Sequence, residues 1–382
     1  MRPLLVACAV ALVGGVVVSV AFAGWTAASA RQWAIRDLGT LGGPESVPSD
    51  INERGWVVGN SDSPRKRKDN PNLHEAEAFL WKAGRMRRLG RSTAEALAIN
   101  DRGQVVGSGR YGWFLWQDGR LRYHGMLGES PLDEVVAINE RGYVVGGKDS
   151  TMKHDSGAPI EHAFLWKNGR MVDLTPSTSG WSRPVALNDR GQVLIDGQLQ
   201  NANGLWEQGR FLPLARRLGG LVDLNERGQV LTSHAVWQQG KAQHLGTKPF
   251  KYCVQSDIND RGVVVGACSN RPQPAIWKGR NPTYIRLAFG DRGQAVAVNN
   301  VGQVVGYSTR VRLSENRTRH LTIRHPTRHA FVWEKGHTTD LGTLGGPDSE
   351  AIAINDQGQI VGWADTKRGN RHAVVWTRQP TK

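Results

Sequence analysis

The chain has 382 residues, a length that on its own corresponds to about two or three domains. It contains 46 glycines and 14 tryptophans, a composition typical of many short strands joined by tight turns, so no helix is expected beyond residues 1–30. The formal net charge of +15 favours anionic partners, and no stretch of the chain is a recognisable catalytic or cofactor motif.

Residues 1–30 have the pattern of a secretory signal peptide. Arg2 precedes a nineteen-residue apolar run, 4–22, and two small-residue cleavage patterns follow, Ala21-Phe22-Ala23 and Ala28-Ser29-Ala30. An uncleaved membrane anchor is the alternative, because the apolar run is long enough to span a bilayer. After cleavage the chain has no transmembrane segment, and we expect it to be exported to the periplasm, the cell surface or the medium.

The remainder, residues 31–382, is one continuous repeat and therefore one predicted domain. Two landmarks alternate strictly along it, an Asn three residues before a Gly and a Trp that closes a short apolar run, and each occurs eight times. The Asn positions are 52, 100, 139, 188, 225, 259, 299 and 355. The Trp positions are 81, 116, 166, 206, 237, 277, 333 and 376. Units of roughly 40 residues are typical of propellers and solenoids.

Each unit divides into four short predicted strands, which we name a to d. Strand a, as in 96–99, is apolar on both faces and is expected to be innermost. Strands b and c follow the patterns of 104–106 and 79–81, whereas strand d, as in 85–89, is polar enough for an outer edge. The Asn and Gly suit the a–b turn, and the charged residues between them are expected only to be solvated.

The ends of the chain indicate a closed ring. The last unit stops at Trp376 without a strand d, whereas residues 37–44 repeat 340–347 letter for letter at the other terminus. The N-terminal strand should therefore complete the last blade, which leaves no open end. We predict an all-β, monomeric eight-bladed β-propeller of four-stranded blades, with seven blades plus an irregular segment as the alternative.

Cleavage of the leader leaves two cysteines, Cys253 and Cys268, on either side of the turn 259–262. Simple antiparallel register places them opposite each other, so they are candidates for a disulfide in an oxidising compartment. Two unpaired thiols are the alternative, because a bulge would shift the register.

The repeat also resembles a known family. The sequence of about residues 33 to 376 is similar to the HAF repeat family of probable extracellular proteins. The similarity is clearest at His162-Ala163-Phe164 and His329-Ala330-Phe331. Other units depart from the motif, as at 112–114 and 274–276. The resemblance implies export and a repeat fold, and it brings no established activity or catalytic residues.

The length of the units varies mainly between strands b and c. The distance from Asn to Trp ranges from 12 to 34 residues, whereas that from Trp to the next Asn ranges only from 19 to 23. Three of the long b–c loops are basic, and a closed ring would make their blades, 7, 8 and 1, neighbours. The basic residues are Arg65, Lys66, Arg67, Lys68, Arg310, Arg312, Arg317, Arg319, Arg324, Arg328, Lys367, Arg368 and Arg371.

The favoured function is a non-catalytic binding or interaction module that uses these basic loops. The expected partner is an acidic glycan, lipopolysaccharide or an acidic protein surface, and nucleic acid is less expected for an exported protein. An enzyme acting on an acidic polysaccharide in the central funnel is the alternative, and solvated loops on a purely structural surface protein are a third hypothesis. Neither a metal nor a cofactor is expected.

Overall fold

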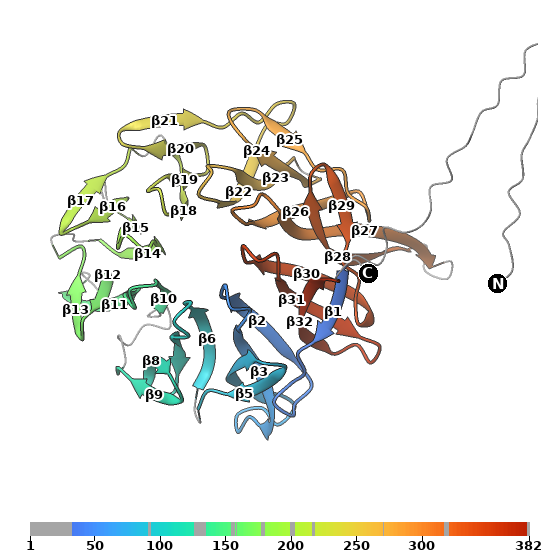
Figure 1. Ribbon diagram of the computed structural model, residues 1–382, viewed down its shortest axis with the longest axis horizontal. Coiled ribbons are helices and arrows are strands. Elements are labelled where there is room, and N and C mark those ends of the chain that lie inside the picture. The colour runs from blue at the N-terminus through green and yellow to red at the C-terminus, as the bar shows by residue number, and fades with distance from the viewer. Residues whose placement is uncertain are drawn as a thin grey trace, which may run out of the picture.

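The computed structural model describes residues 33–90, 93–125, 135–153, 157, 159–176, 180–198, 203–215, 218–269, 271–316 and 321–379. Within these ranges the chain forms eight antiparallel sheets of four strands and no α-helix, and the sheets stand around a central axis like the blades of a propeller (Figure 1). The predicted all-β, eight-bladed propeller is confirmed. The proposed signal peptide, residues 1–30, lies outside the described residues.

The blades follow one another in chain order. Blade 1 contains β2 (Ser46–Ile51), β3 (Val57–Lys66), β4 (His74–Lys82) and β5 (Arg85–Arg88). Blade 2 contains β6 (Thr93–Ile99), β7 (Val105–Gly109), β8 (Gly112–Gln117) and β9 (Arg120–Tyr123). Blade 3 contains β10 (Val135–Ile138), β11 (Val144–Lys153), β12 (Pro159–Lys167) and β13 (Arg170–Asp173). Blade 4 contains β14 (Ser182–Leu187), β15 (Val193–Gly197), β16 (Gly204–Glu207) and β17 (Arg210–Pro213). Blade 5 contains β18 (Leu221–Leu224), β19 (Val230–Thr232), β20 (Ala235–Gln238) and β21 (Lys241–His244). Blade 6 contains β22 (Cys253–Ile258), β23 (Val264–Cys268), β24 (Gln273–Trp277) and β25 (Pro282–Tyr284). Blade 7 contains β26 (Arg292–Val298), β27 (Val304–Asn316), β28 (Leu321–Glu334) and β29 (His337–Asp340). Blade 8 contains β30 (Gly345–Ile354), β31 (Ile360–Thr366), β32 (Arg371–Arg378) and the N-terminal strand β1 (Trp33–Asp37).

Strand a of every blade carries a β-bulge three residues before its landmark Asn. In six of the eight blades a glycine of strand b lies opposite the bulge. Gly107 shows the reason, because a Cβ there would lie 2.0 Å from the carbonyl oxygen of Glu95. The repeated Val-Val-Gly of strand b is therefore a close approach between two backbones.

The apolar core is divided among the junctions between blades. Eight clusters of buried side chains each combine residues of two neighbouring blades, and together they cover all eight junctions. At the first junction Val58 and Leu80 of blade 1 pack with Ile99 and Phe114 of blade 2. Each blade is thus stabilised mainly by its two neighbours, as in other repeat folds.

The N-terminal strand closes the ring in blade 8. β1 pairs antiparallel with β32, with Ile35 opposite Trp376 and Trp33 opposite Arg378, and the two strands lie side by side in Figure 1. The Leu38 N–H then donates to the Ala373 carbonyl at 3.0 Å. The predicted closure of the last blade is confirmed.

A ring of buried asparagines links the eight a–b turns. The side-chain Nδ2 of each Asn donates to the backbone carbonyl of the next Asn at 2.8 to 3.1 Å, and the eighth donates to the first. Within each turn, Oδ1 accepts from backbone N–H groups, as Asn139 does from Arg141 and Tyr143. The landmark Asn therefore shapes its own turn and also joins it to the next blade. The ring members are Asn52, Asn100, Asn139, Asn188, Asn225, Asn259, Asn299 and Asn355.

A second ring lies beside the first and corrects the expectation that the charged turn residues are only solvated. The residue after each ring asparagine accepts, through a side-chain oxygen, the N–H of the corresponding residue in the preceding blade at 2.6 to 3.0 Å. Seven of these eight residues are acidic, so the axial opening on this side is lined with carboxylates. They are Glu53, Asp101, Glu140, Asp189, Glu226, Asp260, Asn300 and Asp356.

The identical stretches 37–44 and 340–347 build loops that share side-chain hydrogen bonds. In the second copy Asp340 accepts from the N–H of Gly342, and Ser349 both donates to the Gly342 carbonyl and accepts from the Ala330 N–H of the preceding blade. Asp37 and Ser46 make the same contacts in the first copy. The His of the His-Ala-Phe motif reaches the same Asp, since His329 Nδ1 lies 2.8 Å from Asp340. This sequence therefore fastens one blade to the next.

Blade 6 carries a disulfide between Cys253 and Cys268. The two cysteines are register partners in β22 and β23, and the bulge lies between Gln255 and Asp257, on the turn side of the pair. Beside the turn Ile258 pairs with Val264, a register that would place Cys253 opposite Ser269, and the one-residue shift at the bulge brings Cys253 opposite Cys268.

Candidate functional site

The two faces of the ring carry different kinds of connection. The a–b and c–d turns are short and uniform and form one face, which we call the turn face. The b–c hairpin ends and d–a connections form the other, the loop face. In blade 7 the hairpin of β27 and β28 stays paired from Val304 and Trp333 out to Asn316 and Leu321, and it extends beyond the ring in Figure 1. Loops on a rigid scaffold are frequent carriers of function.

The three basic stretches lie in adjoining blades. Core clusters join blade 7 to blade 8 and blade 8 to blade 1, so the sequence-based placement of these stretches in one sector agrees with the ring. The basic residues of the long b–c hairpins of blades 7 and 8 that are described with their side chains form the surface that we call the basic rim. The basic rim consists of Arg310, Arg328, Lys367, Arg368 and Arg371.

Two arginines of the basic rim stack on aromatic rings. The guanidinium of Arg371 lies 3.7 Å from the centre of the Trp363 ring, and that of Arg328 lies 4.1 Å from the Tyr307 ring. Trp363 is only 8% exposed, so its ring is a fixed base. Cation–π contacts of this kind hold a planar guanidinium in place and do not neutralise its charge.

Arg310 takes part in a longer stack. Its guanidinium lies 4.4 Å from the centre of the Phe289 ring, and Phe289 stacks on His329 at 3.9 Å with an interplanar angle of 3°. The His329 imidazole is held in turn by Asp340. The d–a connection before β26, which contains Phe289, thus supports a cation on the hairpin of blade 7.

Carboxylates near the rim neutralise part of its charge. Arg328 forms an ion pair with Glu350, and its backbone N–H donates to Asp348 at 2.6 Å. Burial and the nearby Asp348 raise the pKa of Asp365, while Arg371 opposes this rise. Lys367, Arg368 and Arg371 remain exposed on the loop face.

The basic stretch of blade 1 is mostly paired within its own hairpin. Lys68 is exposed, whereas its three neighbours in sequence each have a partner from the same blade. The partners are Glu75 and Glu77 for Arg65, His74 for Lys66, and Asp69 for Arg67. This stretch therefore offers an external anion less charge than its four consecutive cations indicate.

The remaining basic residues of blade 7 are described only in part. Arg312 and Arg324 belong to the paired strands β27 and β28, where they lie opposite His325 and Leu313. Arg317 and Arg319 lie outside the described residues.

Sequence reasoning did not find the aromatic supports of the rim as a set. Trp363 is not one of the eight landmark tryptophans of the repeat, and it lies under Arg371. Trp113, another tryptophan outside the pattern, is 2% exposed and therefore cannot present its face to a ligand. Tyr307 and Phe289 gave no signal, because neither position recurs between blades.

The wall of the axial channel contains three aspartates where the other five blades have alanine, two residues before the ring asparagine. They are Asp50, Asp223 and Asp257. Burial raises the pKa of Asp50 to about 6. Burial, and next the adjacent Asp223 carboxyl, raise the pKa of Asp257 well above its usual value. Asp223 and Asp257 are hydrogen-bonded to each other, which requires one shared proton. The alternation between Asp and Ala was visible in the sequence.

Metal and membrane sites are not indicated in the part of the chain that the structure describes. No group of three or more His, Cys, Asp or Glu residues there is arranged to hold a metal ion. None of its segments forms an apolar helix of the length that a bilayer requires.

The solved structures that are similar to this chain at low identity include a protease domain, a gluconolactonase and a sialidase. The β-propeller domain of the trilobed protease from Pyrococcus furiosus, which has an open velcro topology, is 12% identical with a TM-score of 0.46, covering 88% of this chain and 95% of that one. A gluconolactonase from Xanthomonas campestris is 9% identical with a TM-score of 0.35, covering 93% of each chain. A sialidase from Trypanosoma rangeli in complex with the inhibitor DANA is 11% identical with a TM-score of 0.30, covering 88% of this chain and 55% of that one. No family model and no curated protein matches the chain, and no activity is transferred to it from these structures.

Proposed function

We propose that the protein is an exported, non-catalytic propeller that binds an acidic glycan through the basic rim of blades 7 and 8. The observation that supports this most strongly is the stack of Arg371 on the buried ring of Trp363 at 3.7 Å. An arginine that is held in place before binding loses less side-chain entropy when it meets a carboxylate. Its planar fork also matches a carboxylate or sulfate better than an ammonium does.

The spacing of the cations favours a polymer over a single small anion. The rim residues come from two neighbouring blades, and all except the half-buried Arg328 are exposed; an exposed ion pair contributes only about 0.2–1 kcal/mol. Several such contacts made by one chain add up through effective concentration, whereas a monosaccharide makes one or two. An acidic polysaccharide, or the charged sugar region of lipopolysaccharide, therefore fits the rim better than a free acid does.

Export is part of the same proposal. The pattern of residues 1–30 predicts secretion, and the disulfide of Cys253 and Cys268 is a bond that persists in oxidising compartments. The similarity to HAF repeat proteins favours the same location. Glycans and envelope components are the anions that an exported protein meets, which is why nucleic acid is the less favoured ligand.

The hydrogen-bonded pair of Asp223 and Asp257 supports a second candidate, an enzyme with its chemistry in the axial channel. A carboxyl pair that shares a proton is suited to general acid–base chemistry. The acidic ring on the turn face, however, disfavours an acidic polysaccharide at that opening. This hypothesis therefore favours a neutral substrate, and Asp257→Asn should abolish any hydrolysis of neutral glycans while leaving rim binding intact.

Binding to immobilised uronate-containing and sulfated glycans, compared with neutral glycans, tests the first proposal. The variant Arg328→Gln with Arg371→Gln should bind on the order of tenfold more weakly at physiological salt. The matched control, Arg102→Gln with Arg261→Gln, removes the same charge from exposed positions on the turn face. Equal losses in the two variants would mean that net charge alone causes binding and would refute the rim as a site.

A further inference from the structure

We infer that a groove between blades 1 and 2 on the turn face binds a small organic anion with a flat apolar body. This groove is separate from the basic rim, which lies on the loop face. It has a volume of about 310 Å³, at the lower end of the range for small-molecule sites. Its lining includes Trp56, Leu80, Lys82, Arg87, Leu89 and Trp116, and it also includes the carboxylate of Asp118.

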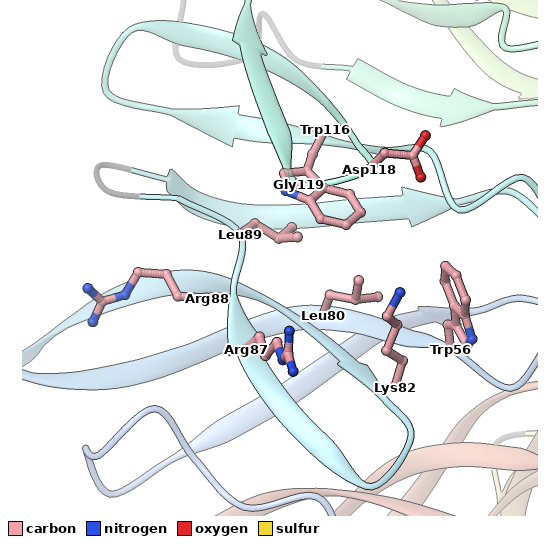
Figure 2. Close-up of a pocket in the computed structure, with 9 residues that line it drawn as sticks. All are labelled: Trp56, Leu80, Lys82, Arg87, Arg88, Leu89, Trp116, Asp118 and Gly119. Carbon is pink, nitrogen blue, oxygen red and sulfur yellow. The ribbon is translucent and has the colours of Figure 1, made fainter.

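The apolar part of the groove comes from both blades. Leu80 and Leu89 are buried at its floor, and the half-buried Trp116 of blade 2 faces them (Figure 2). Trp56 is unusual for the repeat, because five of the other seven blades have Gln four residues after the ring asparagine. Two indole rings and two leucines provide a surface for a flat ring system, which gains from dispersion and from its removal from water.

Two cations stand at the opening of the groove. Figure 2 shows Lys82 beside Trp56, and its ammonium lies 4.1 Å from the centre of that ring. Arg87 is exposed on β5, directly opposite Leu80 in the strand pairing. In the described part of the chain neither cation lies within ion-pair distance of a carboxylate. The exposed Asp118 carboxylate also lines the groove, and together with the two cations it leaves a net positive charge there. Arg88 also lines the groove, and it is paired with Glu77 of its own blade.

The equivalent groove between blades 3 and 4 shows which features are particular to this site. It keeps the framework of the groove, with Leu165 and Trp206 in place of Leu80 and Trp116, and it keeps a lysine, Lys167. Val172 stands in place of Arg87, however, and the ammonium of Lys167 lies 5.7 Å from the centre of the Trp206 ring. This groove therefore lacks the second cation at its opening.

The two grooves together define the ligand class. The cations of the blade 1–2 groove select a negative charge, and the indole and leucine walls select an apolar body of about one or two fused rings. Aromatic carboxylates and sulfonates have both features. Inorganic anions have only the charge, and neutral aromatic alcohols have only the apolar body.

Calorimetric titration of the full chain with 2-naphthoate tests the inference. Binding should weaken about tenfold in Lys82→Gln with Arg87→Gln, since two exposed charge contacts are lost. It should stay unchanged in Lys167→Gln, which removes the lysine of the matched groove. Both sets of residues lie at the surface, so thermal melting is expected to show intact folds.

A second titration does not depend on any variant. The uncharged 2-naphthylmethanol should bind the unaltered protein about tenfold more weakly than 2-naphthoate does. Sodium sulfate, compared at equal ionic strength, should not compete with 2-naphthoate for the groove. Equal affinity for the acid and the alcohol, equal affinity of the double variant and the unaltered protein, or no heat up to about 10 mM naphthoate would each overturn the inference.

Discussion

Replacing one asparagine of the buried ring tests the hydrogen-bonded circle that joins the blades. Asn139 is 4% exposed, donates to the carbonyl of Asn188 at 2.9 Å, and accepts from the backbone N–H groups of Arg141 and Tyr143 at 3.1 and 2.9 Å. Asn139→Ala removes these three bonds and leaves buried backbone groups without a partner. At about 1 kcal/mol for each bond, the free energy of unfolding should fall by about 3 kcal/mol.

The same loss can be expressed as a melting temperature. The entropy of unfolding for roughly 350 residues is about 0.7 kcal/mol/K, so a loss of about 3 kcal/mol lowers Tm by about 4 °C. Differential scanning calorimetry of the full chain measures this shift. Gln357→Ala, an exposed substitution in another a–b turn, should change Tm by less than about 1 °C.

Asn355 extends the test to the junction between the chain ends. Its Nδ2 donates to the carbonyl of Asn52 at 3.0 Å, a bond that exists only if blade 8 meets blade 1. Asn355→Ala should therefore lower Tm about as much as Asn139→Ala does. A shift for Asn139→Ala as small as that of the exposed control would refute the reasoning about the ring, and a much smaller shift for Asn355→Ala would contradict its closure.

Three further predictions concern titration, covalent bonding and the repeated loop. Because the pKa of Asp50 is raised from 3.8 to about 6 in the fold, its contribution to stability is complete below about pH 4 and is lost as the pH rises through 6. Between about pH 4.5 and 7.5 the free energy of unfolding, measured with urea, should therefore fall by about 1–3 kcal/mol less in Asp50→Asn than in the unaltered protein. Cys253→Ala with Cys268→Ala should lower the free energy of unfolding by about 3 kcal/mol, as for a loop of about fifteen residues, and should make Tm insensitive to reductant. Ser46→Ala and Ser349→Ala each remove two hydrogen bonds, one buried and one half-buried, and should each lower the free energy of unfolding by about 2 kcal/mol, as measured by thermal melting.

Each of these predictions has an outcome that contradicts it. An Asp50→Asn protein that loses as much stability with rising pH as the unaltered protein would mean that another group causes the loss. A Tm that responds to reductant in the double alanine variant would argue against the disulfide as its cause. Clearly unequal costs at Ser46 and Ser349 would show that the two identical loops are not energetically equivalent.

Features that depend on local geometry were accessible from the sequence. The Asn and the following Gly predict a tight turn because both residues suit the backbone angles of such a turn. The alternation of apolar runs and turns then predicts four strands in each unit, and the copied stretch 340–347 identifies the partner of the N-terminal strand. Each of these inferences needs only neighbouring residues or exact repetition.

Features that depend on the diameter of the ring were not accessible. The partner of a ring asparagine lies 34 to 56 residues further along the chain in seven of the eight links, and only closure at eight blades sets the 2.8 to 3.1 Å distances between them. The acidic turn residues seemed to need only solvent for the same reason. In the candidate site, the pairing of Arg65 with Glu75 and Glu77 depends on where a long hairpin folds back, which the spacing of charges along the chain does not determine.

The position of a bound glycan tests the central claim most directly. A crystal structure of the protein with an acidic oligosaccharide should show carboxylate or sulfate groups against the guanidinium groups of Arg328 and Arg371 on the loop face. Saccharide bound in the axial channel beside Asp223 and Asp257, with nothing at the basic rim, would contradict the account and would favour the enzyme hypothesis.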